Sequence, residues 1–581
     1  QRQMCIRDRS NIINVARGFE KADLVIKNAN IVNVLSEEIH KADIAIKDGI
    51  IAGIGENYSG EKEIDIQGAY VTPSFIDGHV HLESTMMLPS EFAKVALPAG
   101  TTTVIIDPHE ISNVLGLHGI SFMHEAVKNL PLDVYTMLPS CVPATPFETS
   151  GFDLNSYDLS LLIDKPWVLG LAEMMNFPGV LNQDNNVMAK LELAKSRGKC
   201  IDGHAPYLHG KDLCAYIASG VKSDHECTTP DEAVEKLRLG MYVMVREGTA
   251  AKDLDALMPV LKTCNTRKCI FVTDDRHPAD LKEHINGMVR RAVEAGVDPV
   301  KAIQIASLNT AEYFGLKNLG AIAPGYKADL LILPDLKTFK PDLVIKNGVV
   351  AAENGKLIAE LPENEALAVR NSVNVRWITP EDFRIEANGS KVTALEVIPH
   401  QLITKSVVSE VKIEDGNAVS NIDNDTLKIC VIERHRATGN IGKGFVKGFN
   451  LKCGAIASTV AHDSHNMIVI GTNDADMYAA AVALIKCKGG KVVVKDGEVI
   501  SELPLPIAGL MSDRNFDYVV NKCEELNKTA HSIGCRIEDP FMTMGFLSLP
   551  VIPELKVTDK GVFDTNKFDF IDIFEKALVM K

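Results

Sequence analysis

Two histidines, His79 and His81, stand one residue apart at the end of an apolar run in YVTPSFIDGHVHLES, residues 70–84. On an extended strand, side chains two residues apart point the same way, so both imidazoles can face one point. This geometry suits a metal ion, for which imidazole nitrogen is a frequent ligand. A pair of histidines is a weak pattern by itself, and two unrelated surface or core side chains would look the same.

Ionisable residues also follow other short apolar runs, and most stand at the carboxyl end of their run. Any one of them alone would more often be a loop residue or a hydrogen-bonded polar group. Their repetition along the chain is harder to explain in that way, and it indicates a shared site. The residues are His79 and His81, Asp107 and His109, Glu173, His204, His225, Arg246 and Glu247, and Asp274.

The runs that carry these residues alternate with helix-length connections, at intervals of roughly 20 to 35 residues. Two parallel strands need a crossover connection of about this length, usually a helix. Such a repeat predicts a (β/α)8 barrel, a TIM-like α/β fold in which catalytic groups gather at the carboxyl ends of the strands. The eight expected strands lie within residues 70–84, 101–110, 133–141, 167–175, 199–206, 221–227, 241–248 and 269–278.

The barrel is expected to span residues 73–319, with further domains on both sides. Strand-like runs before and after it share the phrase DLVIKN, which favours one small β-sandwich built from both flanks, residues 10–72 and 320–362. Residues 363–581 return to mixed strands and helices and predict a C-terminal α+β domain. Residues 1–9 fit none of these elements, which leaves open that they are adventitious.

Composition excludes several classes of protein. With 46% hydrophobic and 24% charged residues, the chain is typical of a soluble globular protein of several domains. A net charge of −16 disfavours nucleic acid as a partner, because phosphate contacts need clustered lysine and arginine. The twelve cysteines are scattered, which indicates reduced thiols. Neither a signal peptide nor an apolar run of about 20 residues is found, so we expect a cytoplasmic protein without a membrane segment.

The ionisable set points to catalytic metal chemistry. A structural zinc site would be closed and rich in cysteine. Four histidines, one glutamate and one aspartate are more ligands than one open metal site needs, and they suit two divalent metal ions that share a carboxylate and a water molecule. Manganese, iron and zinc are all admissible. No HExxH motif, GxSxG elbow or phosphate-binding loop stands at a convincing position, so a side-chain nucleophile is unsupported.

Motifs across nearly the whole chain resemble the amidohydrolase superfamily and, within it, the bacterial adenine deaminase family. The resemblance rests on the joint occurrence of GHVHLESTM, TTTVIIDPHE, GLAEMMN, GHAP, SDHEC, VREGT, TDDRHP, VAHDSHN and LPLPIAGLMS. It implies a barrel hydrolase that converts adenine and water to hypoxanthine and ammonia, a reaction of purine salvage. It also implies manganese as the preferred metal and a homo-oligomer, either a dimer or a tetramer.

The resemblance further implies which residues bind the metals. Glu173 would bridge the two ions, in the place that other superfamily members fill with a carboxylated lysine, and no lysine stands near it on its strand. Asp274, rather than its neighbour Asp275, would bind metal and take the proton of the attacking hydroxide. The implied ligands are His79 and His81 for the first metal, Glu173 as the bridge, His204 and His225 for the second metal, and Asp274.

The implied reaction needs an acid, because the ring nitrogen beside the reacting carbon must be protonated as negative charge develops. Glu83, two residues beyond His81, is the first candidate for this proton transfer, and His109 is the second. As an alternative, Glu83 would only orient a ligand histidine. The residues expected to bind the substrate are Arg246, Glu247 and Asp463.

Several alternatives stay open at this level. Arg246 could pair with Glu247 instead of the purine, and the patch VAHDSHN around Asp463 could be a polar loop rather than a cover for the pocket. The substrate could be a cyclic amide or an N-acetyl sugar, although the absence of a barrel lysine disfavours the cyclic-amide hydrolases. A scaffold that has lost catalysis is disfavoured, because all six implied ligand positions are filled.

Overall fold

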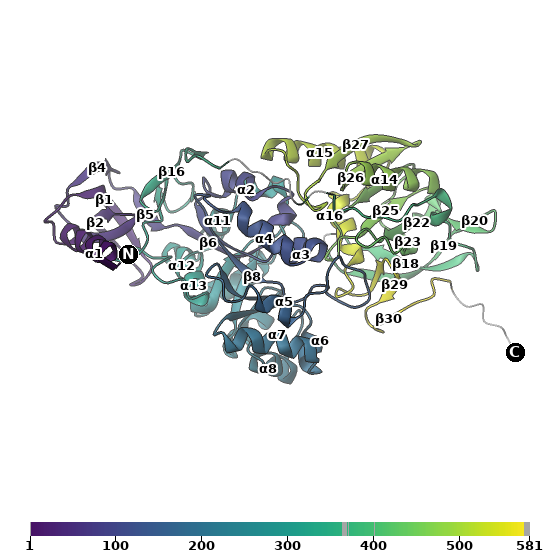
Figure 1. Cartoon of the computed structure of the whole chain (residues 1–581), viewed down its shortest axis with the longest axis horizontal. Coiled ribbons are helices and arrows are strands. Elements are labelled where there is room, and N and C mark those ends of the chain that lie inside the picture. Colours follow the sequence, from purple (N-terminus) through teal and green to yellow (C-terminus); the bar gives the residue numbers. More distant parts are fainter. Residues whose placement is uncertain (1, 363–368, 370, 400, 575–581) are drawn as a thin grey trace.

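A computed structural model describes residues 2–362, 369, 371–399 and 401–574 of the chain. Figure 1 shows three parts in a row: a small sheet that carries the N-terminal helix, a central barrel, and a C-terminal sheet with helices on it. The chain leaves the small sheet to build the barrel, returns to the same sheet, and then forms the C-terminal part. The barrel is therefore an insertion within the small sheet.

Parallel strands β6 to β13 form the barrel. Strands β6–β10 pair in parallel along the chain, and β11–β13 form a second parallel group. The groups are joined where the Lys222 N–H donates to the Ile201 carbonyl at 3.0 Å, and where Val80 and Asp274 form a parallel bridge. The predicted TIM-like barrel is thus confirmed. Its strands are β6 (Phe75–Val80), β7 (Thr101–Ile106), β8 (Asp133–Leu138), β9 (Val168–Met174), β10 (Cys200–Gly203), β11 (Ser223–Asp224), β12 (Tyr242–Arg246) and β13 (Cys269–Val272).

Apolar side chains from different strands fill the barrel, with Ile76, Ile105, Met137 and Ile270 packed in one cluster. Helices alternate with the strands along the chain and lie outside them (Figure 1). They are α2 (Pro89–Ala96), α3 (His109–Leu115), α4 (Leu117–Ala126), α5 (Ser156–Ser160), α6 (Phe177–Leu181), α7 (Asn185–Ser196), α8 (Gly210–Ala218), α9 (Pro230–Arg238), α10 (Leu254–Thr263), α11 (Ile285–Glu294), α12 (Pro299–Ile305) and α13 (Leu308–Tyr313).

The small sheet draws strands from both sides of the barrel, and β5 and β14 join the two flanks as an antiparallel pair. The sequence predicts a sandwich here, whereas the nine strands belong to one hydrogen-bonded sheet. Helix α1 (Arg2–Ala16) includes residues that sequence analysis placed in no element, and Val15 packs on Val25 of this sheet. The strands are β1 (Ala22–Asn33), β2 (Glu38–Lys47), β3 (Ile50–Gly55), β4 (Gly60–Asp65), β5 (Tyr70–Pro73), β14 (Leu330–Leu333), β15 (Leu343–Lys346), β16 (Val349–Glu353) and β17 (Lys356–Leu357).

The C-terminal part is built on an eight-stranded, mostly antiparallel sheet. One face of this sheet shares a hydrophobic core with the barrel, in which Val80 and Ile111 pack together with Ile456 and Met544. The main strands are β18 (Lys391–Val397), β19 (Thr404–Glu410), β22 (Leu427–Ile432), β23 (Ile441–Lys447), β24 (Ala455–Ser458), β25 (Met467–Gly471), β26 (Gly490–Lys495) and β27 (Glu498–Pro504). The helices are α14 (Asp474–Lys486), α15 (Phe516–Ser532) and α16 (Pro540–Gly545). Short pairs and ribbons are β20 (Lys412–Glu414), β21 (Asn417–Val419), β28 (Leu555–Thr558), β29 (Gly561–Asp564) and β30 (Asp569–Phe570).

Two further predictions concern the whole chain. Within the described residues, no helix has both the length and the apolar character needed to cross a bilayer. The cysteines whose side chains are described are all free thiols, in line with the expected lack of a disulfide framework.

Candidate metal centre

The six predicted ligands meet at the carboxyl edge of the barrel, although they come from five strands that are far apart in sequence. Parallel strands all end on the same side, so the residues at or just after those ends converge. All six side chains are largely shielded from solvent. Their positions are His79 in β6, His81 just after β6, Glu173 in β9, His204 after β10, His225 after β11 and Asp274 after β13.

Glu173 lies between two pairs of imidazoles. Its Oε1 atom is 3.8 Å from His79 Nε2 and 3.4 Å from His81 Nε2. Its Oε2 atom faces the other pair, 2.8 Å from His204 Nδ1 and 3.2 Å from His225 Nε2. Each carboxylate oxygen therefore serves a different histidine pair, which is the arrangement that a bridging carboxylate needs.

Asp274 lies beside the first histidine pair, His79 and His81. Its Oδ1 atom lies 3.3 Å from His79 Nε2 and 3.0 Å from His81 Nε2. The backbone N–H of Asp274 donates to the His79 carbonyl at 2.9 Å. This hydrogen bond closes the barrel and also fixes the position of the Asp274 backbone beside His79. Its φ of 56° is left-handed, a conformation that aspartate adopts more readily than most residues.

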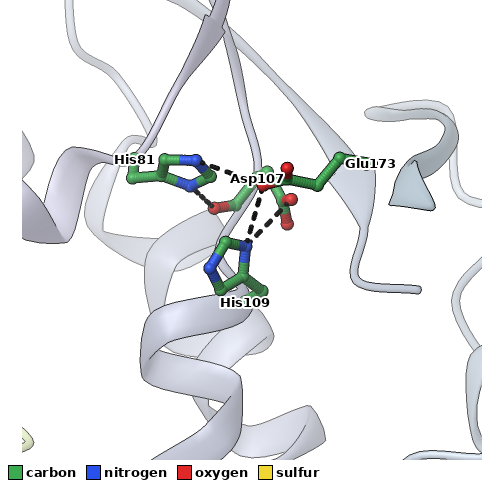
Figure 2. A group of neighbouring side chains, drawn as sticks. All are labelled: His81, Asp107, His109 and Glu173. Carbon is green, nitrogen blue, oxygen red and sulfur yellow. Dashed lines mark hydrogen bonds and ion pairs between the residues drawn. The ribbon is translucent and has the colours of Figure 1, made fainter. Parts of the chain in front are cut away.

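The tautomer of His81 suits metal binding. Its Nδ1 donates to the Asp107 carbonyl at 2.9 Å, which leaves the lone pair on Nε2 directed at Glu173 (Figure 2). The same Nε2 atom faces Asp274. A histidine that binds a metal usually donates its other N–H in this way. The Nε2 atom of His79 is buried without a hydrogen-bond partner. Nitrogen lone pairs and carboxylates packed together away from water need a cation between them, so the residues fit a divalent metal centre.

The charges of the centre depend on its imidazoles. Burial by itself would raise the pKa of the Glu173 carboxyl, but the adjacent His225 and His204 hold that pKa well below its usual value. For Asp274, burial acts in the same direction, and the adjacent His79 and His81 imidazoles keep its pKa low. Both carboxylates are therefore anionic and available as ligands.

His109 and Glu83, the two candidate proton donors, differ in how they are engaged. The Nδ1 atom of His109 lies 3.1 Å from Asp107 Oδ2 and 3.5 Å from Glu173 Oε1 (Figure 2). Glu83 accepts a hydrogen bond from the Ile111 N–H at 3.2 Å through Oε1, whereas its Oε2 is buried without a partner. Burial raises the pKa of Glu83 to about 7. Glu83 is thus a carboxyl group with one free oxygen and a pKa suited to proton transfer near neutral pH.

Arg246 and Glu247 point in opposite directions, because side chains alternate along a strand. Arg246 faces the centre, where its guanidinium contacts Glu226 and lies 3.4 Å from Asp274 Oδ2. Glu247 instead pairs with Arg291 of α11, on the outer side of the strand. The predicted contact of Glu247 with the substrate is therefore corrected, and the alternative ion pair between Arg246 and Glu247 is also not formed.

Asp463 reaches the barrel from the loop between β24 and β25. Its Oδ1 atom is 3.8 Å from His109 Nε2, and its Oδ2 atom is buried without a hydrogen-bond partner. Burial raises its pKa to about 7. The patch VAHDSHN is thus no exposed polar loop, because it packs against the carboxyl edge of the barrel.

Sequence reasoning missed two acidic residues at the site. Glu226 lies 3.5 Å from His225 Nε2, and Glu110 contacts His109 at 3.3 Å. Both directly follow a histidine at a strand end, in HEC and PHE, and this adjacency was the available signal. An acidic residue beside a histidine is also common in ordinary loops, so the signal is weak. A surface groove of about 900 Å³ elsewhere, lined by residues such as Glu91, Lys282 and Asp517, contains none of the site residues.

The fold and the centre together define an amidohydrolase. Residues 70–358 match the model of the amidohydrolase family, residues 401–569 match the adenine deaminase C-terminal domain, and residues 3–74 match the urease alpha-subunit N-terminal domain. The chain is 50% identical to "Adenine deaminase 2" of Carboxydothermus hydrogenoformans, over 97% of this chain and 99% of that protein. It is 49% identical to the adenine deaminase of Desulfatibacillum aliphaticivorans, over the same shares. The chain therefore belongs to the adenine deaminase family.

Solved structures resemble a smaller share of the chain. A beta-aspartyl dipeptidase from Fervidobacterium islandicum AW-1 superposes with a TM-score of 0.46 and 16% identity, covering 59% of this chain and 100% of that chain. L-hydantoinase from Arthrobacter aurescens gives a TM-score of 0.44 and 19% identity, covering 58% of this chain and 98% of that chain.

Proposed function

We propose that this protein is an adenine deaminase, which hydrolyses adenine to hypoxanthine and ammonia. Its relatives at 49–50% identity carry that name and match almost end to end. The observation that carries the proposal is the position of Glu173 between two histidine pairs, because this arrangement is the core of a two-metal hydrolytic centre.

We further propose how the residues divide the metal-binding work. The first divalent cation would be held by His79, His81 and Asp274, the second by His204 and His225, and Glu173 would bridge them. Two cations bound here would supply a nucleophile at neutral pH by lowering the pKa of a shared water. Manganese is the proposed metal, with iron and zinc as alternatives, because the mixed nitrogen and oxygen donors admit all three.

Asp274 and Arg246 are proposed to act together on the attacking water. The Oδ1 atom of Asp274 faces the first histidine pair, where it can take the proton that the water loses. Arg246 holds the other oxygen, Oδ2, at 3.4 Å and so orients the carboxylate. This role replaces the predicted contact between Arg246 and the purine.

Glu83 is the proposed acid for the purine ring nitrogen. It keeps one buried carboxyl oxygen free of hydrogen bonds. His109, by contrast, has carboxylates within 4 Å of both ring nitrogens, Asp107 and Glu173 on one side and Glu110 and Asp463 on the other. A free oxygen can give a proton to a ring nitrogen without first breaking a contact, so Glu83 ranks ahead of His109.

Purified protein from manganese-supplemented cultures tests the proposed reaction. Incubation with adenine should produce hypoxanthine and ammonia in equal amounts, and metal analysis should find about two equivalents per chain. N-acetylglucosamine 6-phosphate, given in parallel, should release no acetate. Acetate release without ammonia from adenine would replace the proposal by a sugar deacetylase, and a protein that holds less than one equivalent would indicate a scaffold.

Two further proposals concern the whole chain. We propose that residues 10–72 with 320–362, residues 73–319 and residues 363–581 are its structural domains, with the pairing of β5 and β14 as support for the first. We also propose a homo-oligomer, a dimer or a tetramer, which light scattering on the purified protein would test.

A further inference from the structure

A buried group of one glutamate and two histidines lies beside the metal centre and has no part in the function proposed above. Glu110 stands in the first turn of α3, and His462 and His465 lie in the loop between β24 and β25. His462 Nδ1 is 2.7 Å from Glu110 Oε1, and His465 Nε2 contacts Glu110 Oε2. All three residues are at most 4% exposed, so this contact between barrel and C-terminal part is sealed from water.

The tautomer of His465 shows whether this group could bind a metal ion. The backbone N–H of Ala461 donates to His465 Nδ1 at 3.2 Å, so this nitrogen carries the lone pair. The proton of the neutral ring is then on Nε2, where it is donated to Glu110. A metal-binding imidazole shows the reverse pattern, as His81 does when it donates through Nδ1 to the Asp107 carbonyl. The group is therefore a carboxylate, Glu110, that accepts hydrogen bonds from two histidine N–H groups, and it is not a third metal site.

The loop that carries the two donors is itself fixed. Arg434 is fully buried and donates to the backbone carbonyls of His465 and of Ala508. His462 stacks on Phe546, with ring centroids 4.3 Å apart and planes 6° from parallel. These contacts leave the donors little freedom to follow Glu110, so Glu110 must conform to them.

Glu110, held in this way, also contacts His109 and restricts the orientation of its ring. Its Oε1 atom, which accepts from His462, is also 3.3 Å from His109 Nε2. The opposite nitrogen of the same ring, Nδ1, lies 3.5 Å from Glu173, the proposed bridging carboxylate. The His109 ring thus lies between the metal centre and a carboxylate that the C-terminal part holds in place.

We propose that Glu110 is a positioning residue for the reaction: clamped by His462 and His465 of the C-terminal part, it sets the orientation of His109 against the metal centre. This inference rests on the proposed adenine deaminase function. It gives the C-terminal part a role in the active site, through His462 and His465, which lie outside the proposed set of metal ligands.

Glu110→Gln is the first test. The carboxamide keeps the shape of the carboxylate, but its NH2 group faces one of the two histidine N–H donors and cannot accept that hydrogen bond. The expected result is a kcat about 10- to 100-fold lower with KM changed less than about 3-fold, as is usual when a supporting hydrogen bond is lost. Metal content should stay at two equivalents. Asp329→Asn, which changes a buried carboxylate paired with Lys346 in the small sheet, is the matched control and should keep the wild-type kcat.

His465→Gln and His465→Ala separate positioning from metal binding and from misfolding. Glutamine can still donate to Glu110 from the Nε2 position, so His465→Gln should recover most of the kcat that His465→Ala loses. Both variants should retain two metal equivalents, and one cooperative melting transition in each would show that both remain folded. Loss of a metal equivalent in His465→Gln would overturn the inference in favour of a third metal site.

Two other outcomes also overturn the inference. Wild-type kcat in Glu110→Gln would show that the clamp does not reach the reaction, and equal kcat in His465→Gln and His465→Ala would show that the donor is irrelevant. In both cases an active wild-type enzyme leaves the proposed function standing. A wild type without adenine turnover would instead overturn the proposed function and, with it, this inference.

Discussion

The partner of the second ring nitrogen decides what each buried histidine of this protein can do. His81 donates through Nδ1 to a backbone carbonyl and keeps Nε2 for the centre, whereas His465 accepts at Nδ1 and donates through Nε2. Two histidines with similar burial thereby take opposite roles. The same logic separates Glu83, which has a free oxygen, from His109, which is engaged on both sides.

Glu83→Gln tests the proposed proton donor at this scale. Glutamine has no proton to release, so we expect kcat for adenine to fall by about 100-fold or more, while two metal equivalents remain bound. Steady-state kinetics and metal analysis check both points. The control is Glu235→Gln, a change in a partly exposed glutamate that pairs with His209. Unchanged kcat in Glu83→Gln, with a large loss in His109→Gln, would transfer the role to His109.

At the scale of the element, successive side chains of a strand face opposite sides, so only one of two neighbouring residues can face the site. In β12 and the residue after it, Arg246 points to the centre and Glu247 points to α11. The carboxyl ends of the parallel strands supply the other site residues by the same rule. Helix α3 starts at such an end, which places His109 and Glu110 together in its first turn.

The adjacent pair Arg246 and Glu247 provides a matched comparison. Arg246→Met leaves Asp274 without its guanidinium partner, so kcat should fall by about 10- to 100-fold. Glu247→Gln weakens the ion pair with Arg291 and the hydrogen bond from the Leu254 N–H, both outside the centre. It should keep kcat within about 2-fold while it lowers the free energy of unfolding by about 1 kcal/mol. Kinetics and thermal melting of both variants check this. A larger kcat loss in Glu247→Gln would contradict the assignment.

Lys556 of β28 predicts a pH-dependent contribution to stability. It is fully buried and donates to the Leu402 and Phe546 carbonyls, and burial lowers its pKa to about 7. In the unfolded chain the pKa is about 10.4, so between these values the unfolded state binds the proton more strongly. The contribution of neutral Lys556 to the free energy of unfolding is therefore complete above about pH 10.4, and it is lost as the pH falls towards 7 because protons then favour the unfolded state.

Lys556→Met removes this titration. We expect the melting temperature of the wild type, relative to the variant, to rise steadily as the pH increases from 7 to 10. Differential scanning calorimetry at several pH values measures the difference. Parallel curves for the two proteins would show that Lys556 does not lose its proton in the folded state.

At the scale of the whole molecule, the barrel and the C-terminal part share one core. Apolar residues of the barrel side, such as Leu82, Phe92 and Ile111, pack with Leu505 and Met544 of the C-terminal part. Hydrogen bonds also cross between them, for example from the Ser512 N–H to the Met86 carbonyl at 2.9 Å. The C-terminal part is thus an integral partner of the barrel.

A chain that ends at residue 362 tests this dependence. Its barrel would expose the apolar side chains that the C-terminal sheet covers, so we expect an insoluble or protease-sensitive product without deaminase activity. Soluble yield and limited proteolysis, compared with the full chain, measure the effect. A soluble, compact fragment with full adenine turnover would contradict both the shared core and the role inferred for Glu110.

The barrel and the residues at its strand ends could be predicted from local signals, whereas the choice of six ligands among them came from the family resemblance. Short apolar runs that end in His79, Glu173 or Asp274 repeat at βα spacing, and parallel strands bring such ends together whatever the connections contain. The direction of Glu247 was missed because the last residue of the strand cannot be located from the run alone, and a shift of one residue exchanges the two faces. Glu110 and Glu226 were missed because an acidic neighbour of a histidine carries no local mark of its contacts.

By itself, the sequence determined which residue types stand at the strand ends and in what order, and these residues favour a hydrolytic metal centre over a side-chain nucleophile. Only the tertiary structure decided that Glu173 faces two histidine pairs, that Arg246 lies beside Asp274, and that a loop of the C-terminal part contacts Glu110. The physical reason is that periodicity is local, whereas hydrogen-bond partners and burial depend on segments hundreds of residues apart.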